Sequence, residues 1–528
     1  MAKVVTPIDI QVVNRHLGAI SEEMGIVLQR SAFSSNIKER RDFSCSIFDA
    51  KARLLAQAAH IPVHLGAMPD VIRMVRDEFD LAPGDIIITN DPFRGGTHLP
   101  DITLVSGVFD EKGKELLFFI AARAHHADVG AKIPGSMGLS RSLDEEGVLI
   151  APSYLSVRGE ILEDYLHELI DQMRNPRERA GDIRAQIACL YRGEQRIRET
   201  LRRFGQNRFM EILPHLLDYG RRFMHSAISE IADGLYEFED FMDDDGVHGT
   251  PVPIRVSLKV EGQEAVVDFS GTAPQAESCI NATMSVTRSA VYYCFFCLVG
   301  EGYPVNAGSL EPVRIKAPEG CLLNPLPPAP VAAGNVETSQ RIVDAVFGAL
   351  SKAIPERIPA AGCGTMNNIA IGSAPGSSTS FTYYETIGGG MGASPRGDGM
   401  SGVQVHMTNT LNTPVEALEQ TYPMMIETYG LRDGSGGKGL YRGGDGIVRR
   451  YRFLEPCSVS LLTERRRFAP YGLQGGEDGK RGRNLFFKKG SSKPLELPGK
   501  CVFEVDAGEG LEIRTPGGGG YGASSIEP

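Results

Sequence analysis

Five of the eleven histidines lie between residues 60 and 126, next to aspartates at spacings that could hold a metal ion. His98 and Asp101 stand three residues apart in a segment rich in glycine and proline, which predicts a turn and not a helix. A second group, His125, His126 and Asp128, follows an apolar, strand-like stretch. Imidazoles and carboxylates together suit Zn²⁺, Mn²⁺ or Fe²⁺. These residues therefore form either a metal site or a set of histidines that only satisfy loop carbonyls.

Other residues could join this site or form another one. Asp42 stands in the charged sequence ERRDF, which by itself is typical of a surface turn. His60 and His64 either line the same pocket or are hydrogen-bonded core histidines. Glu385 precedes a glycine run that could approach a small substrate, although turns between strands explain the run equally well. We interpret the basic cluster 464–467 as a solvent-exposed charge run, with an inter-subunit or anionic-ligand contact as the alternative.

The composition is that of a globular protein. Acidic residues outnumber basic ones by 66 to 55, which gives a formal net charge of −11 and favours neither nucleic acid nor an anionic membrane as partner. No apolar run approaches the roughly 20 residues of a membrane span, and we find no export signal, so we expect a cytoplasmic protein. Cys294 and Cys297 are expected to pack in a core helix. No phosphate-binding glycine loop occurs, so any nucleotide is expected on another chain.

The hydrophobic periodicity predicts an α+β fold with several domains. Expected elements are helices at 8–30 and 68–79, a strand pair within 43–57, and strands at 86–88, 102–108 and 116–122. A further helix over 340–353 is expected to be capped by Thr338 or Ser339. The predicted regions are a mixed α/β region with the metal site (1–160), a helical segment (161–240), an α/β region (241–358) and a glycine-rich, mostly β region (359–528).

Seven segments of the sequence together resemble the hydantoinase B/oxoprolinase family. In order along the chain they are ERRDFSCSIFD, NDPFRGGTHLPDI, HHADVG, NPRERAGDIRAQIACLYRGEQRI, FSGTAPQ, GNVETSQRIVDAVFGAL and TPGGGGYG. The chain looks like the B subunit of an ATP-dependent hydantoinase. The same family includes 5-oxoprolinase, caprolactamase and related subunits of acetone and acetophenone carboxylases.

This resemblance implies a ligand set and a partner. It implies one divalent ion, zinc or alternatively manganese or iron, held by Asp42, His98, Asp101 and His125, with His126 as the alternative to His125. It thereby reverses the surface-turn interpretation of Asp42. It also implies an A-type subunit that binds ATP and phosphorylates the carbonyl oxygen of a small cyclic amide, with two copies of each subunit in an (AB)₂ heterotetramer.

The implied activity is hydrolytic opening of the phosphorylated ring by metal-activated water. His126 and Asp128, and more weakly His64, are expected to orient ligands or transfer protons. One alternative is a subunit of an ATP-dependent ketone carboxylase of the acetone or acetophenone type. Carboxylase relatives of the acetone type have a longer chain and a third small subunit, so the length of 528 residues favours the hydrolase. A second alternative is a scaffold that stabilises the A subunit and binds no metal.

Overall fold

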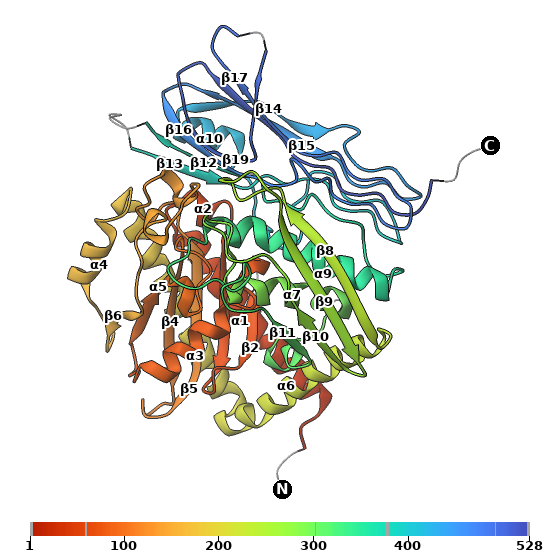
Figure 1. Ribbon diagram of the computed structural model, residues 1–528. Helices are drawn as coiled ribbons and strands as arrows, with labels where there is room; N and C mark the ends of the chain where they lie inside the picture. The colour runs from red at the N-terminus through yellow and green to blue at the C-terminus, as the bar shows by residue number, and fades with distance from the viewer. Residues whose placement is uncertain (1–3, 59–60, 301, 375–379, 492, 525–528) are drawn as a thin grey trace.

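The computed structural model describes residues 4–58, 61–300, 302–374, 380–491 and 493–524. The chain forms a mixed helix-and-sheet body from its N-terminal two thirds, and the C-terminal strands lie as a separate layer against one side of that body (Figure 1). This architecture confirms the predicted α+β class. Among the described helices, none combines the length and the apolar character needed to cross a membrane.

A seven-stranded antiparallel sheet organises the N-terminal region, in the order β2-β1-β5-β4-β3-β6-β7. Its strands are β1 (Phe43–Asp49), β2 (Leu54–Ala58), β3 (Ile86–Thr89), β4 (Asp101–Phe109), β5 (Leu116–His125), β6 (Ser153–Val157) and β7 (Glu160–Ile161). Successive side chains of a strand point to opposite faces, and both faces are covered here. Leu104 packs with side chains of the helices at 7–31 and 176–204, whereas its neighbour Val105 packs with those of the helix at 68–78.

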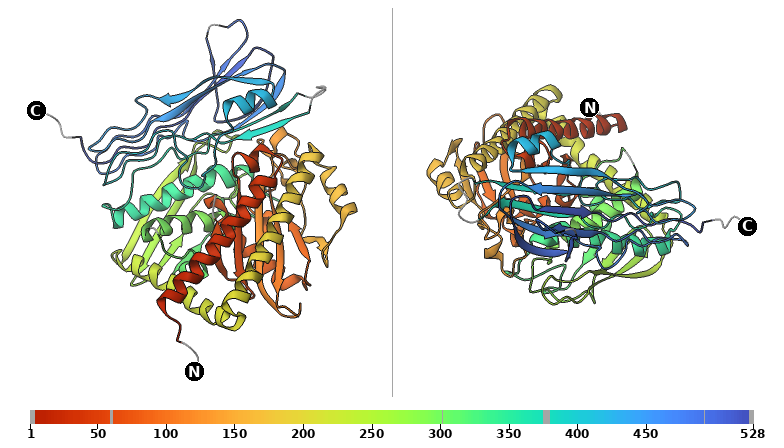
Figure 2. Two further views of the ribbon diagram at one scale, coloured as in Figure 1. Left: turned by 180° about the vertical axis from the view of Figure 1, so that it is seen from behind. Right: turned by 90° about the horizontal axis from the view of Figure 1, so that it is seen from above.

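Three helices cover this sheet: α1 (Pro7–Ser31), α5 (Pro176–Phe204) and α3 (Met68–Glu78). The helix α1 begins with a capping box, in which Thr6 and Asp9 each bind the other's backbone amide. Figure 2 shows α1 lying along the back of the N-terminal sheet. The predicted helices at 8–30 and 68–79 and the predicted strands of this region are thereby confirmed.

After α5 in the sequence, the chain continues through α6 (Gln206–Ser229) into a second sheet with the order β11-β10-β9-β8. The helices of the segment expected at 161–240 therefore end at Ser229, and β8 occupies the last residues of that segment. The other elements of this part are α4 (Glu163–Ile170), β8 (Gly234–Met242), β9 (Val252–Glu261), β10 (Glu264–Asp268), α7 (Met284–Val299), β11 (Val313–Lys316) and α9 (Ser339–Ala353). The core helix expected around Cys294 and Cys297 is α7, and its buried side chains pack with those of α9 and the sheet. Cys294 is buried as expected, whereas Cys297 is exposed, so the packing expected for Cys297 is wrong.

The predicted cap of α9 is wrong. The π-helix η5 (Gly334–Thr338) runs directly into α9, and Thr338 itself has helical backbone angles. Its hydroxyl donates to the carbonyl of Ile280 and caps no helix. A sequence pattern of Thr-Ser before a helical stretch does not distinguish a cap from a wider helical turn, because both place polar residues at the same positions.

The C-terminal layer contains two antiparallel sheets, β13-β12-β16-β19 and β14-β15-β20-β17-β18, which share one apolar core. Its strands are β12 (Asn368–Ser373), β13 (Thr382–Glu385), β14 (Met424–Arg432), β15 (Gly446–Phe453), β16 (Cys457–Leu462), β17 (Arg483–Phe487), β18 (Leu495–Leu497), β19 (Lys500–Val505) and β20 (Gly510–Arg514), with the helix α10 (Val415–Thr421). Glycine-rich segments pack backbone against backbone: a Cβ at Gly390 would lie 2.0 Å from the carbonyl oxygen of Gly444.

Candidate metal centre

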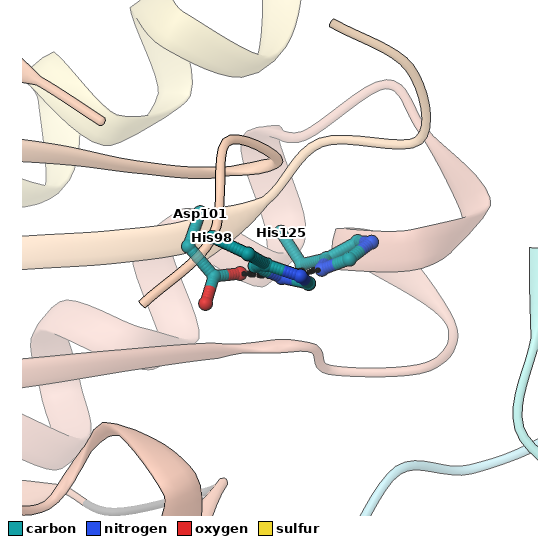
Figure 3. A group of neighbouring side chains, drawn as sticks. All are labelled: His98, Asp101 and His125. Atoms are coloured by element: carbon teal, nitrogen blue, oxygen red, sulfur yellow. Dashed lines mark hydrogen bonds and ion pairs between the residues drawn. The ribbon is translucent and has the colours of Figure 1, made fainter. Parts of the chain in front are cut away.

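The antiparallel pairing of β4 and β5 brings together side chains that are far apart in sequence. Asp101, the first residue of β4, pairs with His125, the last residue of β5. His98 lies in the turn just before β4, where two glycines and Pro100 exclude a helix. Figure 3 shows that the side chains of His98, Asp101 and His125 converge, and we refer to these three residues as the triad.

The three facing atoms of the triad form a nearly equilateral triangle. His98 Nε2 lies 3.1 Å from Asp101 Oδ1 and 3.1 Å from His125 Nδ1, and His125 Nδ1 lies 3.2 Å from Asp101 Oδ1. Ligand atoms around a tetrahedral zinc ion, with bonds of about 2.0–2.1 Å, are about 3.3 Å apart. The triad therefore has the separations of one face of a divalent-ion site, and its two nitrogens and one carboxylate oxygen suit such an ion.

Burial and hydrogen bonding prepare the triad for a cation. His98 and Asp101 are fully buried. His98 Nδ1 lies 3.3 Å from the carbonyl oxygen of Ala332, which can only accept, so Nε2 carries the lone pair in the neutral ring. His125 Nε2 is buried and has no hydrogen-bond partner within the described part of the chain. The residues present thus fit a divalent ion.

Electrostatics within the triad keep the carboxylate ionised. Burial alone would raise the pKa of Asp101, but the nearby His98 and His64 hold that pKa well below its usual range. For His98, burial lowers the pKa while the Asp101 carboxylate raises it, and the net direction is upward. Burial lowers the pKa of His125. An ionised aspartate beside imidazoles is the charge state that a metal ligand set requires.

A further pair of contacts holds the second oxygen of Asp101. His64 Nε2 lies 3.3 Å from Asp101 Oδ2, and the hydroxyl of Thr97 donates to the same oxygen. His64 Nδ1 lies 2.9 Å from Ser44 Oγ on β1. Asp101 Oδ1 is therefore directed to the triad by contacts that fix its partner oxygen, and His64 belongs to the same pocket.

The C-terminal layer supplies an aromatic cover. The Tyr384 ring stacks on His125 at 4.9 Å between centroids and an interplanar angle of 19°, and the Arg40 guanidinium lies 4.8 Å from the same tyrosine ring. Tyr384 donates through its hydroxyl to Asn368, which in turn donates to Glu337 on η5. Sequence reasoning singled out the neighbouring Glu385, but that carboxylate accepts from Arg449. Two adjacent tyrosines before an acid gave no signal that one of them covers a histidine.

The remaining predicted site residues have other contacts. Asp42 accepts from the His125 amide through its backbone carbonyl, and its carboxylate lies 3.9 Å from Arg40 Nη2, so it borders the triad. His126 Nε2 lies 3.0 Å from Gln186 Oε1. Burial lowers the pKa of His126 to about 4. His60 lies outside the described residues. The roles expected for Asp42, His126, Asp128 and His64 stay predictions.

Asp128 holds the turn that follows β5. Its carboxylate accepts from the backbone amides of Gly130 and Gly135 and pairs with Arg174 at 2.9 Å. Contacts of this kind are typical of a residue that fixes a loop. Asp128 therefore helps to set the path of the chain immediately after the triad.

The interpretation of 464–467 as a solvent-exposed charge run is wrong for most of its length. Glu464 and Arg465 are buried, and of the four residues Arg467 alone is exposed. Arg465 pairs with two aspartates and Arg341 pairs with the same two, an arrangement that we call the ionic cluster, made of Asp240, Arg341, Asp344 and Arg465. A run of charges in a sequence carries no information on partners that lie 121 and 225 residues away.

The fold and the triad can be compared with known proteins. The chain belongs to the hydantoinase B/oxoprolinase family, whose profile matches residues 6–524. It is 40% identical to 5-oxoprolinase 1 from Arabidopsis thaliana, over 98% of this chain and 42% of that protein. It is 31% identical to the B subunit of a putative D-/L-hydantoinase from Pseudomonas sp. (strain NS671), over 98% of this chain and 90% of that protein. The chain thus spans about two fifths of the oxoprolinase.

Solved structures agree with this assignment. The ATP-dependent caprolactamase from Pseudomonas jessenii superposes with a TM-score of 0.92 and 27% identity, over 99% of this chain and 92% of that chain. A nucleotide-free acetone carboxylase superposes with a TM-score of 0.86 over 98% of this chain and 76% of that chain. At 18% identity, the second likeness concerns the fold alone. The resemblance inferred from the sequence segments is confirmed.

Proposed function

We propose that this chain is the metal-bearing B subunit of an ATP-dependent hydrolase that opens cyclic amides. The observation that carries the proposal is the triad, whose facing atoms stand 3.1–3.2 Å apart in a buried site. The names of the relatives support the substrate class, because oxoproline, hydantoin and caprolactam are all cyclic amides. The alignment with a protein named as the B subunit of a hydantoinase supports a separate partner subunit. We propose that this partner is an A-type chain that binds ATP and that the two chains form an (AB)₂ assembly.

The residues of this chain have distinct parts in the proposed reaction. His98, Asp101 and His125 would hold a divalent ion, with zinc preferred over manganese or iron and with Asp42 as a candidate ligand beside them. Such an ion, when bound, supplies Lewis-acid polarisation of a substrate oxygen and lowers the pKa of water. Ring opening breaks a C–N bond, and the leaving nitrogen needs a proton.

His64 is the residue that we propose for this proton transfer. It contacts Asp101 Oδ2 and not the triangle of facing atoms, so its ring is near the reacting groups without being a ligand. His126 and Asp128 are proposed to orient the end of β5, through Gln186 and through the backbone of the following turn. Phosphorylation of the carbonyl oxygen by the partner would remove much of the amide resonance before water attacks.

Co-expression with an A-type subunit tests the proposal. We expect the purified pair to open 5-oxoproline, hydantoin or caprolactam with stoichiometric release of ADP, and to lose ring opening when either chain is absent. The variant His98→Ala should abolish ring opening, whereas His248→Ala, which removes a half-exposed histidine, should not. Ring opening by the His98→Ala pair at the wild-type rate would contradict the proposal, as would ATP-dependent carboxylation of acetone in place of hydrolysis.

A further inference from the structure

The π-helix η5 places an asparagine against the triad. Asn335 Nδ2 lies 3.0 Å from His98 Nε2. The other end of the same amide, Oδ1, is buried and has no hydrogen-bond partner among the residues that the structure describes. The residue is 4% exposed, so bulk water does not satisfy this oxygen. A buried amide oxygen without a partner costs free energy, and a ligand that binds this oxygen would remove that cost.

The Asn335 amide and a cation compete for the single lone pair of the neutral His98 ring. In the neutral ring Nδ1 carries the proton, because it lies 3.3 Å from the carbonyl oxygen of Ala332. The lone pair of Nε2 can accept from Asn335 Nδ2 or bind a cation, but it cannot do both. A cation at the triad therefore displaces the Asn335 N–H from its hydrogen bond with His98 and leaves the amide without that partner next to the ion.

We propose that Asn335 is a further ligand of the cation, through Oδ1. The terminal torsion of an asparagine is broad and two-fold, so rotation of the amide exchanges the places of Oδ1 and Nδ2. The place now taken by Nδ2 is 3.0 Å from His98 Nε2, and the triad atoms are 3.1–3.2 Å from one another. The inference rests on the cation site of the proposed function and adds a neutral oxygen to it.

The surroundings hold Asn335 in this place without the ion. Its backbone carbonyl accepts from the hydroxyl of Ser339 at 2.7 Å. The preceding residue, Gly334, packs so closely that a Cβ there would lie 1.7 Å from the carbonyl oxygen of Asn281. The turn around Asn335 is π-helical, a geometry that often occurs at functional sites because it changes the direction in which a side chain points. The backbone of Asn335 is therefore held in place before a cation binds, and the rotation of its side-chain amide brings Oδ1 to the ion.

Titration of the chelator-treated full chain with Zn²⁺ and with Mn²⁺, without ATP or substrate, tests the inference. Asn335→Ala should weaken the affinity at least about tenfold, the size typical of lost support at a metal site. Asn335→Asp should bind the ion with wild-type affinity or more tightly, since the aspartate side chain has the same length and ends in an oxygen that can bind a cation. His98→Ala should abolish binding. Equal urea midpoints of the metal-free variants and wild type verify that the fold is intact.

Two results would overturn the assignment of Asn335. The first is wild-type affinity in Asn335→Ala while His98→Ala binds no ion, which would mean that the cation site exists but that Asn335 is not one of its ligands. The second is weak binding in Asn335→Ala that Asn335→Asp does not restore, which assigns the residue a packing role. If His98→Ala also binds ions like the wild type, the cation site fails and the proposed function fails with it.

Discussion

The triad and the ionic cluster are both buried, yet they differ in how their charges are balanced. The ionic cluster holds two arginines and two aspartates, so its formal charges cancel within the chain. In the triad, an ionised aspartate faces imidazoles, and its described ion pairs are all with histidines. The ionic cluster joins the C-terminal layer to the body, and it needs no added ion to balance its charges. The triad lacks a permanent positive charge, and this difference marks it as the ligand site.

The largest expected effect is a loss of ring-opening activity when the triad, and not the ionic cluster, is altered. His98→Ala should lower the rate of ring opening by about 1,000-fold or more, because a cation contributes several kcal/mol to the transition state. The folded state should persist, since the variant removes one of several ligands and no ion pair of the ionic cluster. Steady-state rates with the A-type partner check this expectation. A loss of less than tenfold would contradict the assignment.

The next effect concerns stability and applies to the ionic cluster. Arg465→Ala should lower the free energy of unfolding by about 3–5 kcal/mol, because it leaves two buried aspartates with Arg341 as their one remaining arginine partner in the cluster. The neighbouring Arg467→Ala is the matched control, and its exposed position predicts a change within about 0.5 kcal/mol. Urea unfolding of both variants measures the difference. Similar midpoints for the two would show that the cluster contributes little.

A smaller effect tests the aromatic cover of the triad. Tyr384→Leu removes the ring stacked on His125 and should weaken metal binding about tenfold, as loss of residues behind metal ligands commonly does. Tyr384→Phe keeps the ring and loses only the hydroxyl bond to Asn368, so it should retain most of the affinity. Metal titration compares the two variants. Equal affinities in both would mean that the stack does not position His125.

The positions of these residues show what a sequence can predict. The strands β4 and β5 were predictable from their apolar runs, and a candidate cluster that includes the triad from its residue types and spacing, because both signals are local. The choice of ligands within that cluster came from the family resemblance. Tyr384 and Asn335 lie more than 200 residues from the histidines that they contact, and although Asn335 belongs to one of the family-like segments, no local pattern links either residue to the triad. The burial of Arg465 was missed for the same reason, because its aspartate partners come from β8 and α9.

The smallest effect is a pH dependence of stability at Glu337. Burial raises the pKa of this residue to about 8. Between its unfolded pKa, about 4.3, and pH 8, the folded chain holds a proton that the unfolded chain releases, so stability falls as pH rises through this window. Glu337→Gln keeps the oxygen that accepts from Asn368 and cannot ionise.

Urea unfolding at pH 5 and pH 9 measures this effect. We expect the wild type to lose at least about 1 kcal/mol more than Glu337→Gln across this range, since a tenfold change in proton affinity corresponds to about 1.4 kcal/mol. The exposed Glu356→Gln serves as control and should retain the wild-type slope. An unchanged slope in Glu337→Gln would show that Glu337 is ionised in the folded chain at pH 5.

Metal content is the most direct test of the central claim that the triad binds a cation. Elemental analysis of the purified chain, after chelation and reloading with Zn²⁺ or Mn²⁺, should find one ion per chain in the wild type and in Arg465→Ala. The same analysis should find none in His98→Ala. A wild-type chain that takes up no stoichiometric ion, or a His98→Ala chain that takes up a full equivalent, would contradict the account.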